Sequence, residues 1–214
     1  MSDFSAGVFI LSKHKYRVYP FLKDDEFFIQ YNEHWVGKLS PTDTNEDFQV
    51  QTLALSKEAP LLHIINAEDH GFCVQILHEE KIIFKFEIPY NIEADYAHEI
   101  GTELFGEDWF LDFDKAQERY QQANEEAAKR LAEKNIPAKY FDDINDEKLQ
   151  AFHVFGFDEK TLKKVQQILT VENFTQDSYE MVHAFLYSIY LTKFSFVSHS
   201  YISHGDDRFT LLNK

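Results

Sequence analysis

The sequence predicts an α+β fold in which an N-terminal, mainly antiparallel β-sheet is followed by a helical C-terminal half. Up to residue 92, apolar and polar side chains alternate, as in strands that expose one face to water. From about Asn91 onward the apolar residues recur with the period of a helix. A chain of 214 residues that is 44% hydrophobic and 16% aromatic buries a core without needing disulfides.

The N-terminal strands are expected where short alternating runs are bounded by turn residues. These runs are residues 7–11, 27–31, 35–39, 61–67, 72–77 and 82–88. In the last run, the even positions from Ile82 to Ile88 are predicted to share one face, and Lys85 and Glu87 the other. Residues 48–55 fit both a strand and a helix period, and we favour a strand.

The C-terminal helices are expected at residues 92–106, 115–134, 138–144, 146–152, 159–169 and 176–192. The longest, Lys115–Lys134, has a narrow apolar stripe, which predicts one close neighbour and much exposure to water. The stripe consists of Ala116, Tyr120, Ala123, Ala127 and Leu131. Residues 194–203 return to alternation and are expected to be a strand or an extended tail. A late strand is expected to rejoin the sheet. We divide the chain into a β-rich domain, 1–92, and a mainly helical domain, 93–214.

The cellular setting predicted from the sequence is cytoplasmic. The single cysteine, Cys73, cannot form an internal disulfide, and the N-terminus lacks a basic leader with a long apolar run. No apolar stretch approaches the roughly 20 residues of a membrane helix, so no membrane partner is expected. Cys73 lies in an alternating strand with apolar neighbours, which favours an inert thiol over a nucleophile.

Negative charge is concentrated in the middle of the chain. The net charge is −16, and residues 93–147 contain 16 Asp and Glu against 6 Lys and Arg. Residues 148–214 are balanced, with 7 of each kind. Such a surface repels a phosphate backbone, so nucleic-acid binding is not expected, whereas a basic protein is attracted and steered.

The first functional hypothesis is therefore a non-enzymatic interaction protein that needs no cofactor and binds a basic protein partner. In composition it is similar to bacterial inhibitor and immunity proteins, an analogy without a motif match. The charges expected to contact the partner are Glu125, Glu126, Asp142 and Asp143. The exposed aromatic anchors are expected to be Trp109, Phe110, Tyr140 and Phe141. The competing explanation is that the acidic residues only keep the protein soluble.

The second hypothesis is a metal-dependent hydrolase or a small-ligand-binding protein. On a helix over 94–103, His98 and Glu99 share a face with Asp95, and Glu103 lies one turn beyond Glu99. Imidazole and carboxylates at this spacing bind divalent metals or transfer protons. The site uses His98, Glu99 and Glu103, and His183 or His199 can join them as a further ligand. We favour the simpler explanation that acidic residues occupy the first turn of a helix.

Two further groups of polar residues have a structural explanation that we favour. In 195–207, two histidines and two aspartates lie close in sequence, but His199 and His204 are five residues apart. That spacing points the two rings to opposite faces of a strand, which favours a solvated loop over a metal site. A polar stripe is expected at the rim of the core rather than in a pocket: Tyr179, His183, Tyr187 and Tyr190. Signature loops for phosphate, dinucleotide or α/β-hydrolase chemistry are absent.

Overall fold

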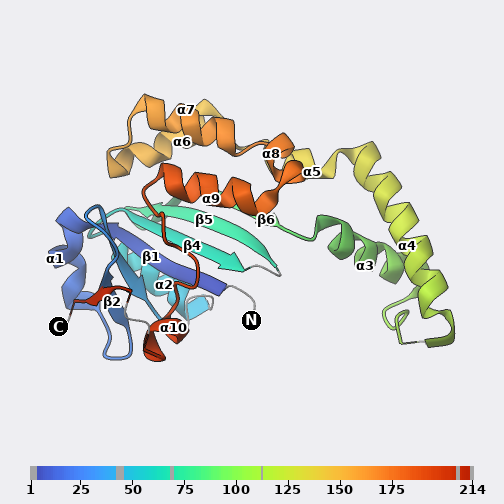
Figure 1. The fold of residues 1–214 in the computed structure, drawn as a ribbon, viewed down its shortest axis with the longest axis horizontal. Helices are drawn as coiled ribbons and strands as arrows, with labels where there is room; N and C mark the ends of the chain where they lie inside the picture. Colours follow the sequence, from blue (N-terminus) through green and yellow to red (C-terminus); the bar gives the residue numbers. More distant parts are fainter. Residues whose placement is uncertain (1–3, 42–45, 68–69, 112, 206–207, 213–214) are drawn as a thin grey trace.

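The computed structural model describes residues 4–41, 46–67, 70–111, 113–205 and 208–212. Its centre is an antiparallel sheet of seven strands in the order β6-β5-β4-β1-β3-β2-β7 (Figure 1). The strands are β1 Phe4–Leu11, β2 Phe27–Gln30, β3 Trp35–Leu39, β4 Leu61–Ala67, β5 Gly71–His78, β6 Lys81–Pro89 and β7 Thr210–Leu211. The predicted α+β fold with an N-terminal antiparallel sheet is therefore confirmed.

The hairpin of β5 and β6 shows how the alternation of apolar and polar side chains gives the sheet a buried and an exposed face. It also shows one position where this alternation does not predict burial. Phe84, Phe86 and Ile88 are buried on one face, and the alternate side chains Lys85 and Glu87 are exposed on the other. The prediction that Ile82 shares the buried face is wrong, because its side chain is 52% exposed. Between Ile76 and Leu77 of β5 the pairing with β6 shifts, so that β6 has one extra residue at this point. Such a bulge turns the side chain beyond it to the opposite face of the sheet.

Residues 46–55 form a helix, α2 Glu46–Leu55, so the favoured strand over 48–55 is wrong. Leu55 belongs to an apolar cluster that includes Val8 and Ile10 of β1 and Leu61 of β4. These strand residues lie on the sheet face that α2 covers together with α1 Lys15–Val18. The sequence of residues 48–55 fits the period of a strand and that of a helix equally well. The segment forms a helix because the apolar face of the sheet has to be covered.

The opposite face of the sheet is covered by C-terminal helices, which form a second layer (Figure 1). After α3 and α4, described below, and the short α5 Ile136–Lys139, the helices of this layer are α6 Asp146–Leu149, α7 Glu159–Ile168, α8 Val171–Gln176 and α9 Ser178–Ser188. The short helix α10 His199–Ser203 lies apart from them (Figure 1). Short 3₁₀ turns occupy Ser12–His14, Tyr19–Phe21 and Gln150–Phe155. The side chains of Asp158, Thr170 and Asp177 cap α7, α8 and α9 by accepting backbone N–H bonds, which explains where these helices begin.

Aromatic rings form the contact between sheet and helices. Phe185 of α9 lies edge-on to Phe72 of β5 and to Phe152, with ring centroids 5.7 and 6.2 Å apart. The Trp35 indole of β3 donates a hydrogen bond of 2.8 Å to the carbonyl of Ile189. One apolar cluster thus joins side chains from both sides of residue 92, and the division into two domains there stays a prediction.

The C-terminal segment rejoins the sheet later than its alternation suggests. Residues 199–203 form the short helix α10, so the strand or extended tail expected over 194–203 is wrong. Phe196 has a positive φ of 57°, which interrupts an extended conformation. The expected late strand is instead β7, which pairs with β2, and the Leu212 N–H bonds the Phe28 carbonyl at 2.7 Å. Among the described residues, no helix is long and apolar enough to span a membrane.

Replacing Phe185 by alanine tests the aromatic contact between the two layers. Because this ring is 0% exposed, we expect Phe185→Ala to lower the free energy of unfolding by about 3–5 kcal/mol. The control is Tyr187→Ala on the same helix, where the side chain is 63% exposed and a change below about 0.5 kcal/mol is expected. Urea denaturation followed by circular dichroism measures both, and equal losses would contradict the assignment of Phe185 to the core.

Candidate functional site

The acidic segment forms an antiparallel helical hairpin that projects from the sheet and its helix layer (Figure 1). It consists of α3 Ile92–Phe105, which follows β6 directly, and α4 Phe113–Lys134, and we call residues 92–134 the arm. We call the sheet with α1, α2 and α5 to α10 the body. At 1.5 Å per residue, the 22 residues of α4 extend about 33 Å.

The two arm helices contact each other along a narrow seam. Ala123 and Ala127 of α4 are buried at the seam, as are Ala97 and Ile100 of α3. The predicted apolar stripe of the long helix is thus confirmed at Ala123, Ala127 and Leu131, all buried, whereas Tyr120 is 46% exposed. Because alanine side chains are short, the helices approach closely and most of each helix surface stays in water.

The far end of the arm is closed by Trp109, which is only 1% exposed. Its ring lies over Gly101 of α3, where a Cβ atom would stand 2.3 Å from the indole. Tyr120 packs against the same ring at 4.5 Å, and Arg119 donates a hydrogen bond of 3.1 Å to the Trp109 carbonyl. The expectation that Trp109 is an exposed anchor is therefore wrong, because the missing side chain of Gly101 provides a slot for it. Phe110 is half-buried.

Most carboxylates of the arm face water. Exposed acidic side chains that form no ion pair with a Lys or Arg of the described residues are Glu93, Asp95, Glu99, Glu107, Asp108, Glu118, Glu125 and Glu133. Within this surface, Glu125 accepts a hydrogen bond only from the neutral amide of Gln121. The negative charge of these groups is therefore available to a cation outside the chain.

Arg130 engages two further carboxylates and holds the helices together. Its guanidinium bonds Glu126 of α4 at 2.7 Å and Glu103 of α3 at 2.8 Å. Hydrogen bonding to Arg130 lowers the pKa of both carboxyls, and the two carboxylates raise the pKa of Arg130. Glu126, a predicted partner contact, is thus paired within α4 to the arginine that reaches Glu103 of α3.

The remaining predicted contacts lie at the other end of α4, where the arm meets the body. Phe141 packs on Phe86 of the sheet with ring centroids 5.4 Å apart, so its ring belongs to the core rather than to an exposed surface. Burial raises the pKa of the half-buried Tyr140, and the charges of Glu99, Asp95 and Glu87 raise it further. Tyr140 thus lies among carboxylates of α3 and β6. Asp142 and Asp143, which follow it, are exposed.

The structure does not bring the residues of the alternative metal site together. Glu103 is bound by Arg130, and the His98 ring packs near Trp109 and Phe110 at 5.9 and 5.6 Å. No group of three metal-ligating side chains converges within the described part of the chain. His183 packs on Tyr179 at 4.2 Å, and His199 bonds the Asp25 carbonyl at 2.8 Å.

The two other polar groups singled out from the sequence belong to the body. His204 bonds the Ser200 carbonyl within its own turn at 2.6 Å, while Asp206 and Asp207 lie outside the described residues. In the polar stripe of α9 and its end, Tyr179, Tyr187 and Tyr190 are exposed and His183 is half-buried. Tyr190 stacks on His34 with ring centroids 4.5 Å apart.

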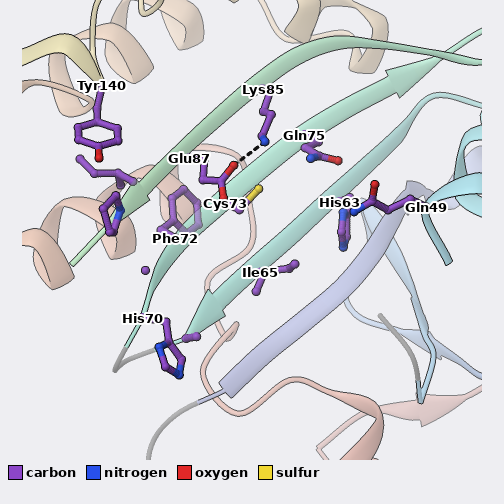
Figure 2. A pocket seen from close by; sticks show the side chains of 14 residues that line it. Gln49, His63, Ile65, His70, Phe72, Cys73, Gln75, Lys85, Glu87 and Tyr140 are labelled. Atoms are coloured by element: carbon purple, nitrogen blue, oxygen red, sulfur yellow. Dashed lines mark ion pairs between the residues drawn. The ribbon is translucent and has the colours of Figure 1, made fainter. Parts of the chain in front are cut away.

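A separate hollow of about 480 Å³ lies on the sheet face that carries the exposed side chains of β5 and β6 (Figure 2). Cys73 faces Glu87 across the two strands, and Glu87 forms an ion pair of 2.5 Å with Lys85. Burial, followed by the charge of Glu87, raises the pKa of the Cys73 thiol to about 11. The thiol is therefore neutral near pH 7, which agrees with the inert role expected from the sequence.

Two contributors were not found from the sequence. Glu87 was placed only on the polar face of a strand, whereas in the structure it lines the hollow of Figure 2 together with Tyr140. Gly101 was not singled out, although a glycine inside a helix costs about 1 kcal/mol and so indicates a packing reason. No family profile, curated protein or solved structure matches the chain.

Adding a side chain at Gly101 tests how the end of the arm is closed. We expect Gly101→Ala to displace the Trp109 ring and to destabilise the arm by about 1–3 kcal/mol. Tryptophan emission should shift to the red and acrylamide quenching should increase, because the only other tryptophan, Trp35, stays buried. Thr102→Ala, which removes only a hydroxyl bonded within its own helix, is the control. An unchanged spectrum for Gly101→Ala would contradict the packing.

The raised pKa of Cys73 makes a kinetic prediction. Because the folded thiol stays protonated until the pH approaches about 11, alkylation by iodoacetamide at pH 8 should be about 100-fold slower in the native protein than in urea. Glu87→Gln removes a negative charge that raises the pKa and should accelerate alkylation of the folded protein. Glu79→Gln, outside the hollow, is the control. Equal rates for the native and unfolded chains would be inconsistent with this environment.

Proposed function

We propose that the protein is a non-enzymatic, cytoplasmic interaction protein, similar in kind to inhibitor and immunity proteins, whose acidic arm binds a basic protein partner. The observation that carries the proposal is the hairpin of α3 and α4, with its exposed and unpaired carboxylates. A surface of this sign attracts Lys and Arg side chains, accelerates their approach and orients them.

The position of the arm supports binding rather than solubility alone. Acidic residues that serve only solubility can be spread over any part of a surface. Here 12 of the 37 acidic residues fall within the arm and four more within residues 135–147, whereas residues 148–214 are balanced. At physiological ionic strength the field of a charge is screened over roughly 8 Å, so clustered carboxylates act together on one partner.

Apolar anchors for the partner come from residues other than Trp109. Among the side chains of the arm that the structure describes, three large apolar ones are well exposed: Leu104 at 46%, Leu111 at 56% and Tyr120 at 46%. All three belong to the end of the arm distant from the body. Charged rims contribute mainly to the association rate, whereas desolvated apolar side chains slow dissociation. The proposed interface therefore combines this apolar end with the carboxylates of both helices.

Charge reversal on the arm, compared with charge reversal on the body, tests the proposal. The arm variant carries Asp95→Lys, Glu99→Lys, Glu125→Lys and Glu133→Lys, all at exposed positions, and it leaves the Arg130 ion pairs intact. The body variant carries Asp25→Lys, Glu33→Lys, Glu79→Lys and Glu80→Lys, all at exposed positions, and changes the net charge equally.

Immobilised wild-type protein and both variants are used to capture proteins from lysate of the organism that encodes the chain. We expect the wild type and the body variant to retain the same basic protein, and the arm variant to retain at least about tenfold less. Retention should also fall between about 50 and 500 mM salt. Equal losses for both reversed variants would show that only net charge matters and would remove the proposal.

A further inference from the structure

A groove of about 640 Å³ lies where the arm meets the body. We call it the arm-base groove. Its lining comes from the start of α3, the end of α4 and the neighbouring parts of α8 and α9, and includes Ile92, Ala94, Ala128, Leu131, Ala132 and Phe174. Clefts between two structural units are common places for binding, and this volume is within the usual range of about 300–1,000 Å³.

The groove has a fixed apolar floor and open walls. Ile92, Leu131 and Phe174 are buried to at least nine-tenths and belong to the main core cluster, so their positions are set by the packing of the body. Ala94 and Ala128, in contrast, are exposed, and their short side chains leave the space between them unfilled. A side chain that enters the groove therefore meets packed apolar atoms below it.

Charges of both signs lie around the groove: Lys129 and Lys134 are next in sequence to the lining residues Ala128 and Asn135, and Lys129 pairs with Glu126 at 3.9 Å. Glu93 is the one charged residue among the described residues that line it. Glu125 and Glu172 are also exposed, and each lies three residues before a lining residue on the same helix, Ala128 or Thr175, so they share its face. The groove thus combines an apolar floor with an acidic border, and it continues the negative surface of the arm. This combination complements a segment that carries both apolar and basic side chains.

We propose that the arm-base groove receives the apolar side chains of a basic amphipathic helix belonging to the partner protein. On such a helix, apolar residues at positions i and i+4 enter the groove, and the flanking Lys and Arg side chains contact Glu93 and the arm. This inference rests on the proposed function, because it assigns a binding site and a chemical class to the same basic partner.

Filling the groove without changing its charge tests the inference. Ala128→Phe places a large side chain at an exposed position of α4 that lines the groove. Ala54→Phe makes the same exchange at an exposed position of α2, outside the groove, and is the matched control. Ala132→Phe is a second filling variant, used if Ala128→Phe changes the circular dichroism spectrum or the melting temperature.

Two synthetic helical peptides of equal length and charge serve as probes, one with Leu and Lys and the other with Ser in place of each Leu. Binding is measured by fluorescence anisotropy of the labelled peptides. We expect the wild type and Ala54→Phe to bind the Leu–Lys peptide more tightly than the Ser–Lys peptide. Ala128→Phe should weaken binding of the Leu–Lys peptide by at least about tenfold and leave the Ser–Lys peptide unaffected.

The outcomes separate this inference from the proposed function. If Ala128→Phe binds the Leu–Lys peptide as tightly as the wild type does, the groove is not the binding site and the inference is wrong. The proposed function survives that result if the arm variant, with its reversed charges, loses binding of both peptides. Loss of neither peptide in the arm-reversed variant overturns the proposed function itself. A change in the sedimentation of the protein alone on introducing Ala128→Phe would identify a second copy as the occupant and would contradict the inference.

Discussion

The narrow alanine seam between α3 and α4 is the constraint on which the exposed acidic surface depends. Ala97, Ala123 and Ala127 allow the helices to approach closely, so their contact is made over a small part of each helix circumference. The carboxylates on the remaining faces stay hydrated, which avoids the cost of burying charge. Repulsion among them is offset by the seam, by Arg130 between Glu103 and Glu126, and by packing at the end of the arm.

The body and the arm differ in how they are stabilised. The body contains a continuous aromatic core, in which Phe72, Phe152 and Phe185 connect the sheet to the helices. The arm contributes few buried side chains of its own, and Ile92 and Leu131 join it to the core at its base. Segments with little buried apolar area open locally at low free energy. The base of the arm is therefore its best-fixed part, and the arm-base groove lies there.

The sequence predicted most of the sheet and the long arm helix because single-segment periodicity determines them. Prediction from the sequence failed where contacts between residues far apart in the chain determine the local structure. Residues 48–55 satisfy both periods, and only the uncovered sheet face selects the helix. Trp109 is placed by the space over Gly101, a relation that charge patterning does not contain. Of the predicted partner contacts, Glu125, Asp142 and Asp143 are exposed, whereas Phe141 packs into the core because Phe86 and Phe174 lie beside it.

We propose that a basic partner binds the arm rather than the surface in general. A sharp test is a titration of the isotopically labelled protein with a Lys-rich helical peptide, followed by amide chemical shifts in NMR spectra. We expect the shifts to concentrate in residues 92–134 and 140–143 and to disappear at high salt. Shifts spread evenly over the exposed acidic residues of the body, or confined to the sheet, would contradict it.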